Sequence, residues 1–166
     1  MGLAPMIYGV GLDKRVYAQL LEGMTPHTVW RPVGNGPVDS VATHGNMIYA
    51  VREDHCVYRQ ALASMNLESE WVRVSRGDVR MVAFHGDDIF AAGIDQMVWK
   101  QAVRDMTTET KWMLVAKGHV FAICFHSGHI FAVGVEGALW KQPLIGMTIE
   151  TDWQPASKGT VESVTV

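Results

Sequence analysis

A single 41-residue period runs through nearly the whole chain. Four independent sets of residues carry it: Trp30, Trp71, Trp112 and Trp153; Tyr17, Tyr58, Trp99 and Trp140; Met24, Met65, Met106 and Met147; Gly36, Gly77, Gly118 and Gly159. A fixed period of this length is typical of solenoids, propellers and arrays, in which each repeat is one supersecondary unit. A site built from repeated residues occurs in several copies, so the repeat favours multivalent binding over catalysis.

Each repeat reads as four short strands. In the second copy the β-rich runs are Met47 to Val51, Cys56 to Leu62, Trp71 to Val74 and Val79 to Phe84. They are rich in Val, Ile, Tyr, Phe and Trp and are bounded by Gly, Asp, Asn or Ser, which is the signature of strands and turns. No window keeps a helical apolar period over ten residues. Four antiparallel strands in about 40 residues indicate a propeller blade.

We therefore predict an all-β fold, a four-bladed β-propeller of four 41-residue repeats. It forms one domain, residues 1–166, with repeats at about 6–46, 47–87, 88–128 and 129–166, the last completed by 1–5. The C-terminal run, Val161 to Val166, matches a first strand and is expected to pair with the N-terminal blade, which removes two sheet edges and gives a monomer. Alternatively, the four units stack as a β-prism or join another chain.

Composition excludes several classes of protein. The net charge is −3 and the pI about 6.1, which gives no electrostatic reason to expect nucleic acid. No apolar stretch approaches the length of a membrane span, so no membrane insertion is expected. The first residues lack the charged and apolar regions of a Sec-type signal peptide, which indicates a soluble cytoplasmic or non-classically exported protein, with a processed secreted chain left open. Cys56 and Cys124 do not recur with the repeat and are expected to be buried free thiols.

The recurring apolar residues are interpreted as blade-building residues. The outer-strand Trp and the third-strand aromatic lie inside strand patterns and are expected in the core. An alternative is that their faces line sugar pockets. The recurring Met is expected to fill gaps between blades.

Polar residues that recur are candidates for a binding site. Acidic residues occupy the tip between strands two and three: Asp13, Asp54, Asp95 and Glu136. They either cap their own turns or accept hydrogen bonds from ligand hydroxyls. The loops from strand four to strand one share that face and supply candidate donors: Asn35, Arg76, Lys117 and Lys158. Loops on a rigid scaffold are where binding usually occurs.

Two kinds of chemistry receive less support. His44, His85 and His126 end the first strands and could ring one mouth of the channel, but no carboxylate or thiol recurs beside them, so no metal or other cofactor is expected. The chain has no Gly-x-Ser-x-Gly elbow, phosphate loop or His-Glu-x-x-His sequence, so we expect no catalytic residues and no enzyme activity.

The repeat resembles those of the tachylectin and tectonin lectins. The likeness lies in Ile48-Tyr49-Ala50-Val51, Asp54, Val57-Tyr58-Arg59-Gln60, Trp71 and Gly77, and each copy repeats it. The resemblance implies a propeller that binds N-acetylated or methylated hexoses through several equivalent loop sites, as in innate defence. Those families usually have five or six blades, and their Gly-Gly-Trp turn is replaced here by Gly34-Asn35-Gly36 and its counterparts.

These observations predict a multivalent carbohydrate-binding protein that recognises glycans on cell surfaces. The tip carboxylates would act as hydroxyl acceptors and the neighbouring loop residues as donors. The alternative is a protein-interaction scaffold that uses the same face or the central channel.

Overall fold

The computed structural model describes residues 4–166 and contains four antiparallel sheets. Blade 1 contains β1 (Met6–Val10), β2 (Val16–Leu20) and β3 (Arg31–Gly34). Blade 2 contains β4 (Ser40–His44), β5 (Met47–Val51), β6 (Val57–Ala61) and β7 (Val72–Arg73). Blade 3 contains β8 (Val79–His85), β9 (Asp88–Gly93), β10 (Val98–Ala102) and β11 (Met113–Ala116). Blade 4 contains β12 (Ala122–His126), β13 (His129–Val133), β14 (Leu139–Pro143) and β15 (Gln154–Pro155). Two short 3₁₀ turns, η1 (Val103–Asp105) and η2 (Val135–Gly137), interrupt the loops.

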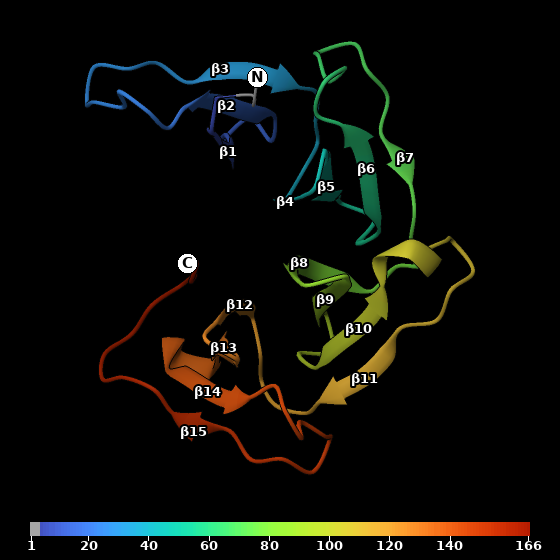
Figure 1. The fold of residues 1–166 in the computed structure, drawn as a ribbon, viewed down its shortest axis with the longest axis vertical. Coiled ribbons are helices and arrows are strands. Elements are labelled where there is room, and N and C mark those ends of the chain that lie inside the picture. Colours follow the sequence, from blue (N-terminus) through green and yellow to red (C-terminus); the bar gives the residue numbers. More distant parts are fainter. Residues whose placement is uncertain (1–3) are drawn as a thin grey trace.

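The four sheets lie around a common centre (Figure 1). Strands that follow each other in sequence are neighbours in every sheet, so each blade is a simple meander. The first strands of successive blades are innermost, and β4 contacts both β1 and β8, while β8 also contacts β12. The prediction of an all-β, four-bladed propeller is confirmed. No helix within residues 4–166 is long and apolar enough to cross a membrane.

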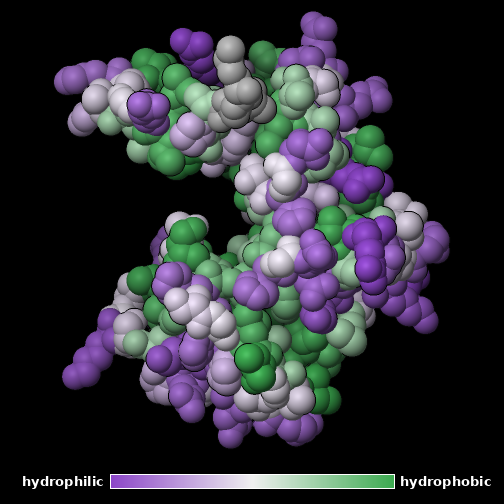
Figure 2. Space-filling view, viewed as in Figure 1, coloured by the Kyte–Doolittle hydropathy of each residue, from purple (hydrophilic) through white to green (hydrophobic). Residues whose placement is uncertain are grey.

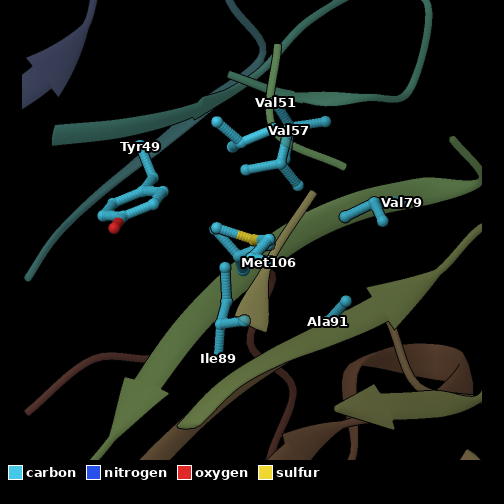
Figure 3. Packing of buried hydrophobic residues seen from close by; sticks show 9 residues of the cluster. Tyr49, Val51, Val57, Val79, Ile89, Ala91 and Met106 are labelled. Atoms are coloured by element: carbon cyan, nitrogen blue, oxygen red, sulfur yellow. The ribbon is translucent and has the colours of Figure 1, made fainter. Parts of the chain in front are cut away.

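Three apolar clusters hold neighbouring blades together, one at each blade-to-blade junction. The cluster between blades 2 and 3 includes Tyr49, Val57, Ile89 and Met106 (Figure 3). Residues of β9, β10 and β11 pack in the same way against blade 4, and Val16 of blade 1 packs against Ile48 and Trp71 of blade 2. Each junction buries apolar faces of two sheets, which is the main source of stability in such an arrangement.

The recurring methionines fill these junctions, as the sequence predicts. Met106 is 6 % exposed and belongs to the cluster between blades 2 and 3, and Met65 and Met147 pack on the clusters before their own blades. An unbranched, flexible thioether suits such irregular gaps. Met24 is the exception at 45 % exposure, because blade 1 has no blade packed before it.

The predicted closure of the ring by the C-terminal strand is wrong for this structure. Residues 161–166 form no strand, and the first sheet contains three strands, with β1 at its free edge. A wide opening separates blade 1 from blade 4, and the C-terminus lies at its inner side (Figures 1 and 2). Residues 161–166 therefore do not pair with β1, and the first sheet is not completed by the C-terminal run.

Candidate functional site

The tip carboxylates of the first three blades adopt one arrangement. Asp54 Oδ1 accepts a hydrogen bond from the Cys56 N–H at 3.1 Å, and its Oδ2 accepts one from the Tyr58 hydroxyl at 2.7 Å. Asp13 does the same with the Arg15 N–H and the Tyr17 hydroxyl. Asp95 accepts from the Met97 N–H and from the Trp99 indole N–H. A carboxylate that bonds the N–H two residues on is an Asx turn, so these side chains shape the tip and orient the third-strand aromatic.

These contacts lower the pKa of two of the carboxyls. Burial by itself raises the pKa of Asp54, but hydrogen bonds from Tyr58 and Cys56 outweigh it, and the pKa lies below its ordinary value. The pKa of Asp13 is lowered in the same way, with burial opposing the bonds from Arg15 and Tyr17. Both Tyr hydroxyls have raised pKa values, chiefly because they donate to the carboxylates. At neutral pH both carboxyls are therefore ionised and both Tyr hydroxyls are protonated, which are the forms that make these hydrogen bonds.

A pH-dependent stability follows from the lowered carboxyl pKa values. The stabilisation is present above the unfolded pKa of about 3.9 and is lost as pH falls through the lower folded pKa. We expect Asp13→Asn/Asp54→Asn to unfold at a lower temperature than the wild type at pH 7, with the difference shrinking as acid protonates the wild-type carboxyls. Thermal melts across the acid range measure this, with exposed Asp87→Asn as the control. A difference between wild type and variant that stays constant into acid would contradict it.

Glu136 does not match the other three tip residues. It has a left-handed backbone (φ 62°) within η2, and the turn is closed by backbone bonds, with the Ala138 N–H donating to the Val135 carbonyl at 3.5 Å. The extra methylene of Glu places its carboxylate beyond the short Asx geometry. The four acidic residues that share a register in sequence therefore form three equivalent sites and one distinct turn.

Pockets lie beside the tips of blades 1, 3 and 4, and we call them the tip pockets. In each, the third-strand aromatic and the outer-strand Trp form walls. The blade 1 pocket, about 640 Å³, is lined by Asp13, Tyr17 and Trp30. The larger blade 3 pocket, about 840 Å³, is lined by Asp95, Trp99 and Trp112. The blade 4 pocket, about 260 Å³, is lined by Trp140 and Trp153. The aromatics predicted to be core residues are thus only partly buried in these blades.

The residue that opens these pockets is a glycine that the sequence analysis did not single out. Gly11, Gly93 and Gly134 share one register. A Cβ at Gly93 would meet Asp95 and the Trp99 indole, and a Cβ at Gly134 would lie 3.0 Å from Trp140, so the ring rests against the bare backbone. Comparing the four copies at this position would have revealed it, because the fourth member of the register is Arg52.

In blade 2, Arg52 occupies the corresponding place. Its guanidinium carbon lies 5.1 Å from the centre of the Tyr58 ring, and its Nε donates to the Pro37 carbonyl at 3.1 Å. Trp71 is only 9 % exposed because it packs in the cluster with Val16 of blade 1. A cation over an aromatic face is an attractive contact, so the Arg52 side chain covers the ring face that is open in the other blades.

One of the four predicted loop donors lines the same pocket as a tip carboxylate. Arg76 and Asp95 line the same blade 3 pocket, together with Asp78. Lys117 instead forms an exposed ion pair with Glu150 at 3.5 Å, and the Asn35 and Lys117 carbonyls accept the indole N–H groups of Trp71 and Trp153. Lys158 and Asp13 lie in blades on opposite sides of the ring opening. These two bonds attach the loops at Asn35 and Lys117 to the following blades, whereas the buried Trp112 indole N–H of blade 3 has no hydrogen-bond partner among residues 4–166.

The histidines that end the first strands of blades 2 and 3 pack on aromatic rings of the next blade. His44 stacks on Phe84 with centroids 4.8 Å apart, and His85 packs on Phe125 at 5.3 Å, each reaching the first strand of the next blade. Within residues 4–166 no three side chains of metal-binding type come together. Cys56 and Cys124 are both buried and free, as predicted.

Comparisons with known structures agree with the fold. The chain is similar to YCF48 bound to D1 peptide (16 % identity, 89 % of this chain and 48 % of that chain, TM-score 0.55). It is also similar to BamB from Moraxella catarrhalis (15 % identity, 97 % and 48 %, TM-score 0.56). A computationally designed protein, Ika4, matches over 86 % of this chain and 87 % of its own (13 % identity, TM-score 0.50). At these identities the likeness is one of fold.

The chain spans about half the length of the YCF48 and BamB chains that it matches. No protein-family model matches the sequence. No curated protein matches it either. The lectin family suggested by the repeat therefore rests on the residues of the repeat itself.

Proposed function

We propose that this propeller is a multivalent carbohydrate-binding protein whose sites are the tip pockets. The observation that carries the proposal is the repeated combination, in blades 1 and 3, of two partly exposed aromatic walls with a carboxylate at the rim. Aromatic faces pack on the apolar faces of pyranose rings, and carboxylate oxygens accept hydrogen bonds from sugar hydroxyls. Blade 4 offers the aromatic walls without the bonded Asp, so its pocket would take a related but less polar part of a glycan.

The carboxylate is available because its own bonds leave lone pairs free. Asp95 Oδ1 and Oδ2 each accept from Trp99, and Oδ1 also accepts from the Met97 N–H, yet an ionised carboxylate has about four acceptor positions. Arg76 lines the same pocket, and a guanidinium can donate to a second hydroxyl. The blade 3 pocket therefore has an acceptor, a donor and two aromatic faces.

Several such pockets on one rigid body favour surfaces over free sugars. Each pocket is shallow and open, so a single sugar would bind weakly. Sites held in fixed geometry raise avidity by about 10²–10⁴ when they engage together. The expected ligand is a dense glycan surface carrying N-acetylated or methylated hexoses.

A glycan array on the purified protein tests this function. We expect binding to a defined group of glycans, competed by the matching free sugar and weakened by Trp99→Ala with Asp95→Ala. Glu68→Ala, at an exposed loop away from the tip pockets, is the matched control. A blank array from folded protein would remove the lectin proposal.

A second candidate is recognition of a peptide by the same propeller face. It is favoured by the similarity to YCF48, whose structure contains a bound D1 peptide. Aromatic walls and an acidic rim also suit a basic or aromatic peptide side chain. Binding to a peptide library that free sugars do not compete would support this candidate over the lectin.

A further inference from the structure

One face of blade 1 carries the residues that form junctions in the other blades, but no other blade within residues 4–166 packs on it. Met24 is 45 % exposed and Trp30 40 % exposed, whereas their counterparts Met106 and Trp71 are buried against the preceding blade. β1 also leaves one edge unpaired, while β5, β9 and β13 each pair with a first strand. An unpaired inner strand beside an apolar face is a ready site for strand addition.

We propose that a second copy of this chain fills the opening, so that two chains form one closed ring of eight blades. In this ring blade 4 of each copy contacts blade 1 of the other copy, so the two chains meet at two equivalent junctions. The contact is head to tail, and it closes because two half-rings complete the circle. This proposal does not depend on the proposed function.

The side of blade 4 that faces the opening carries the residues that would complete the junction with blade 1. The Val161 N–H donates to the Gly137 carbonyl at 2.9 Å, as Val38, Val79 and Val120 donate to Lys14, His55 and Gln96. Val161 therefore holds the position that precedes the first strand in the other blades, although residues 161–166 form no strand in the single chain. Yet Val161 is 41 % exposed, whereas Val38, Val79 and Val120 are buried. In β14, Leu139 is half-buried where Val16, Val57 and Val98 are fully buried.

The repeat fixes how the second copy pairs. Ser40 lies opposite Val51 and Ala122 opposite Val133, so Ser163 would lie opposite Val10 of the other copy, and Thr165 opposite Tyr8. Trp71 and Trp153 donate to the carbonyls of Asn35 and Lys117, 36 residues earlier in sequence. Trp112 Nε1 of blade 3 has no such partner among residues 4–166. If the new junction follows blades 2 and 4, Trp30 donates to the carbonyl of Lys158 from the other copy. The blade 1 tip pocket would then gain the preceding loop that the blade 3 pocket already has.

The curvature of the blade row favours a second copy over closure within one chain. All four blades superpose together on the YCF48 and BamB chains, which are about twice as long. Four blades therefore match part of a longer chain of the same fold, and an opening separates blade 1 from blade 4 (Figure 2).

The mass of the unmodified protein in solution is the first test. We expect native mass spectrometry and light scattering to give 36.8 kDa, twice the 18.4 kDa of one chain. Trp30→Ala should shift the protein toward monomer, and Trp112→Ala, inside the chain, should not. A monomer at all protein concentrations would overturn the proposal.

A disulfide trap distinguishes a second copy from closure within one chain. In Val10→Cys/Ser163→Cys we expect oxidation to give a covalent dimer on a non-reducing gel. The matched control, Ser40→Cys/Val51→Cys, has the same register inside blade 2 and should cross-link within one chain at monomer mass. Cross-linking of the first pair at monomer mass would instead establish closure by the chain's own strand. Mixed Val10→Cys and Ser163→Cys single variants should give the covalent dimer only if two copies exchange strands.

Discussion

Filling the three open tip pockets with arginine is expected to abolish avid binding to a glycan surface. The variant is Gly11→Arg/Gly93→Arg/Gly134→Arg, and it copies what blade 2 already carries at this register, Arg52. In blade 2 the guanidinium covers Tyr58 and bonds the Pro37 carbonyl, so a blade can hold an arginine at this register. At the three glycines the added Cβ displaces the aromatic ring or the Asp side chain that rests against the backbone, which itself disrupts the pocket. Under the proposed function the three pockets act together, so loss of all three should reduce apparent affinity by at least about 10²-fold. Surface binding kinetics on the best glycan from the array measure the loss.

The control for this variant must add the same charge elsewhere. Asn46→Arg/Asp87→Arg also adds three positive charges, and both residues are exposed on hairpins at the opposite ends of β5 and β9 from the tips. It should bind as the wild type does. Circular dichroism and melting of both variants separate loss of binding from loss of fold. Wild-type binding by the folded triple variant would place the sites elsewhere.

The reverse change gives an effect of opposite sign. Arg52→Gly removes the side chain that lies over Tyr58 and is expected to open a fourth tip pocket beside Asp54 and Trp71. The number of sites titrated by a monovalent sugar should rise by one for each chain. Arg59→Gly in the same blade, outside the tip, is the control, and no change in stoichiometry with Arg52→Gly would show that Arg52 is not a plug.

The blades could be predicted from the sequence because each is specified locally. The apolar, β-branched run of β5 favours a strand, and the Asx turn that begins at Asp54 ends it. The 41-residue period carries a similar sequence in all four copies. The order of strands in each sheet follows from short connections, which leave only neighbouring pairings. The Met at each junction was also predictable, since it recurs with the blade.

Closure and the open pockets were not predictable in the same way. Whether Val161 to Val166 reaches β1 depends on the angle between blades, which is set by how large residues such as Tyr49 and Met106 pack, and no periodic pattern encodes that angle. The pockets depend on the lack of a side chain at Gly11, Gly93 and Gly134. A glycine also occurs in ordinary turns, so its recurrence in the sequence does not by itself indicate a pocket. Glu136 shows that a shared position in the repeat does not fix the conformation of the turn, because a side chain longer by one methylene group accompanies a different turn.

Ile89→Ala is expected to cause the largest loss of stability of any single change considered for this chain. Ile89 is fully buried in β9 and belongs to the cluster that joins blade 3 to Tyr49 and Val57 of blade 2 (Figure 3). Removing three carbons from a buried isoleucine costs about 2–5 kcal/mol, because transfer energy is lost and a cavity remains. A domain of this kind is stable by about 5–15 kcal/mol, so the change removes a large share.

Urea unfolding of Ile89→Ala and the wild type at one fixed protein concentration measures the difference, because association would make stability depend on concentration. We expect a lower midpoint with an unchanged slope, which marks a loss of stability rather than a change in the unfolded state. Ile145→Ala makes the same chemical change at a residue that is 91 % exposed and should shift the free energy of unfolding by about 0.5 kcal/mol or less. Equal effects of the two substitutions would mean that the cluster between blades 2 and 3 does not stabilise the ring. A large loss for Ile89 alone would show that the junction between blades, rather than the single sheet, is the unit that holds this fold together.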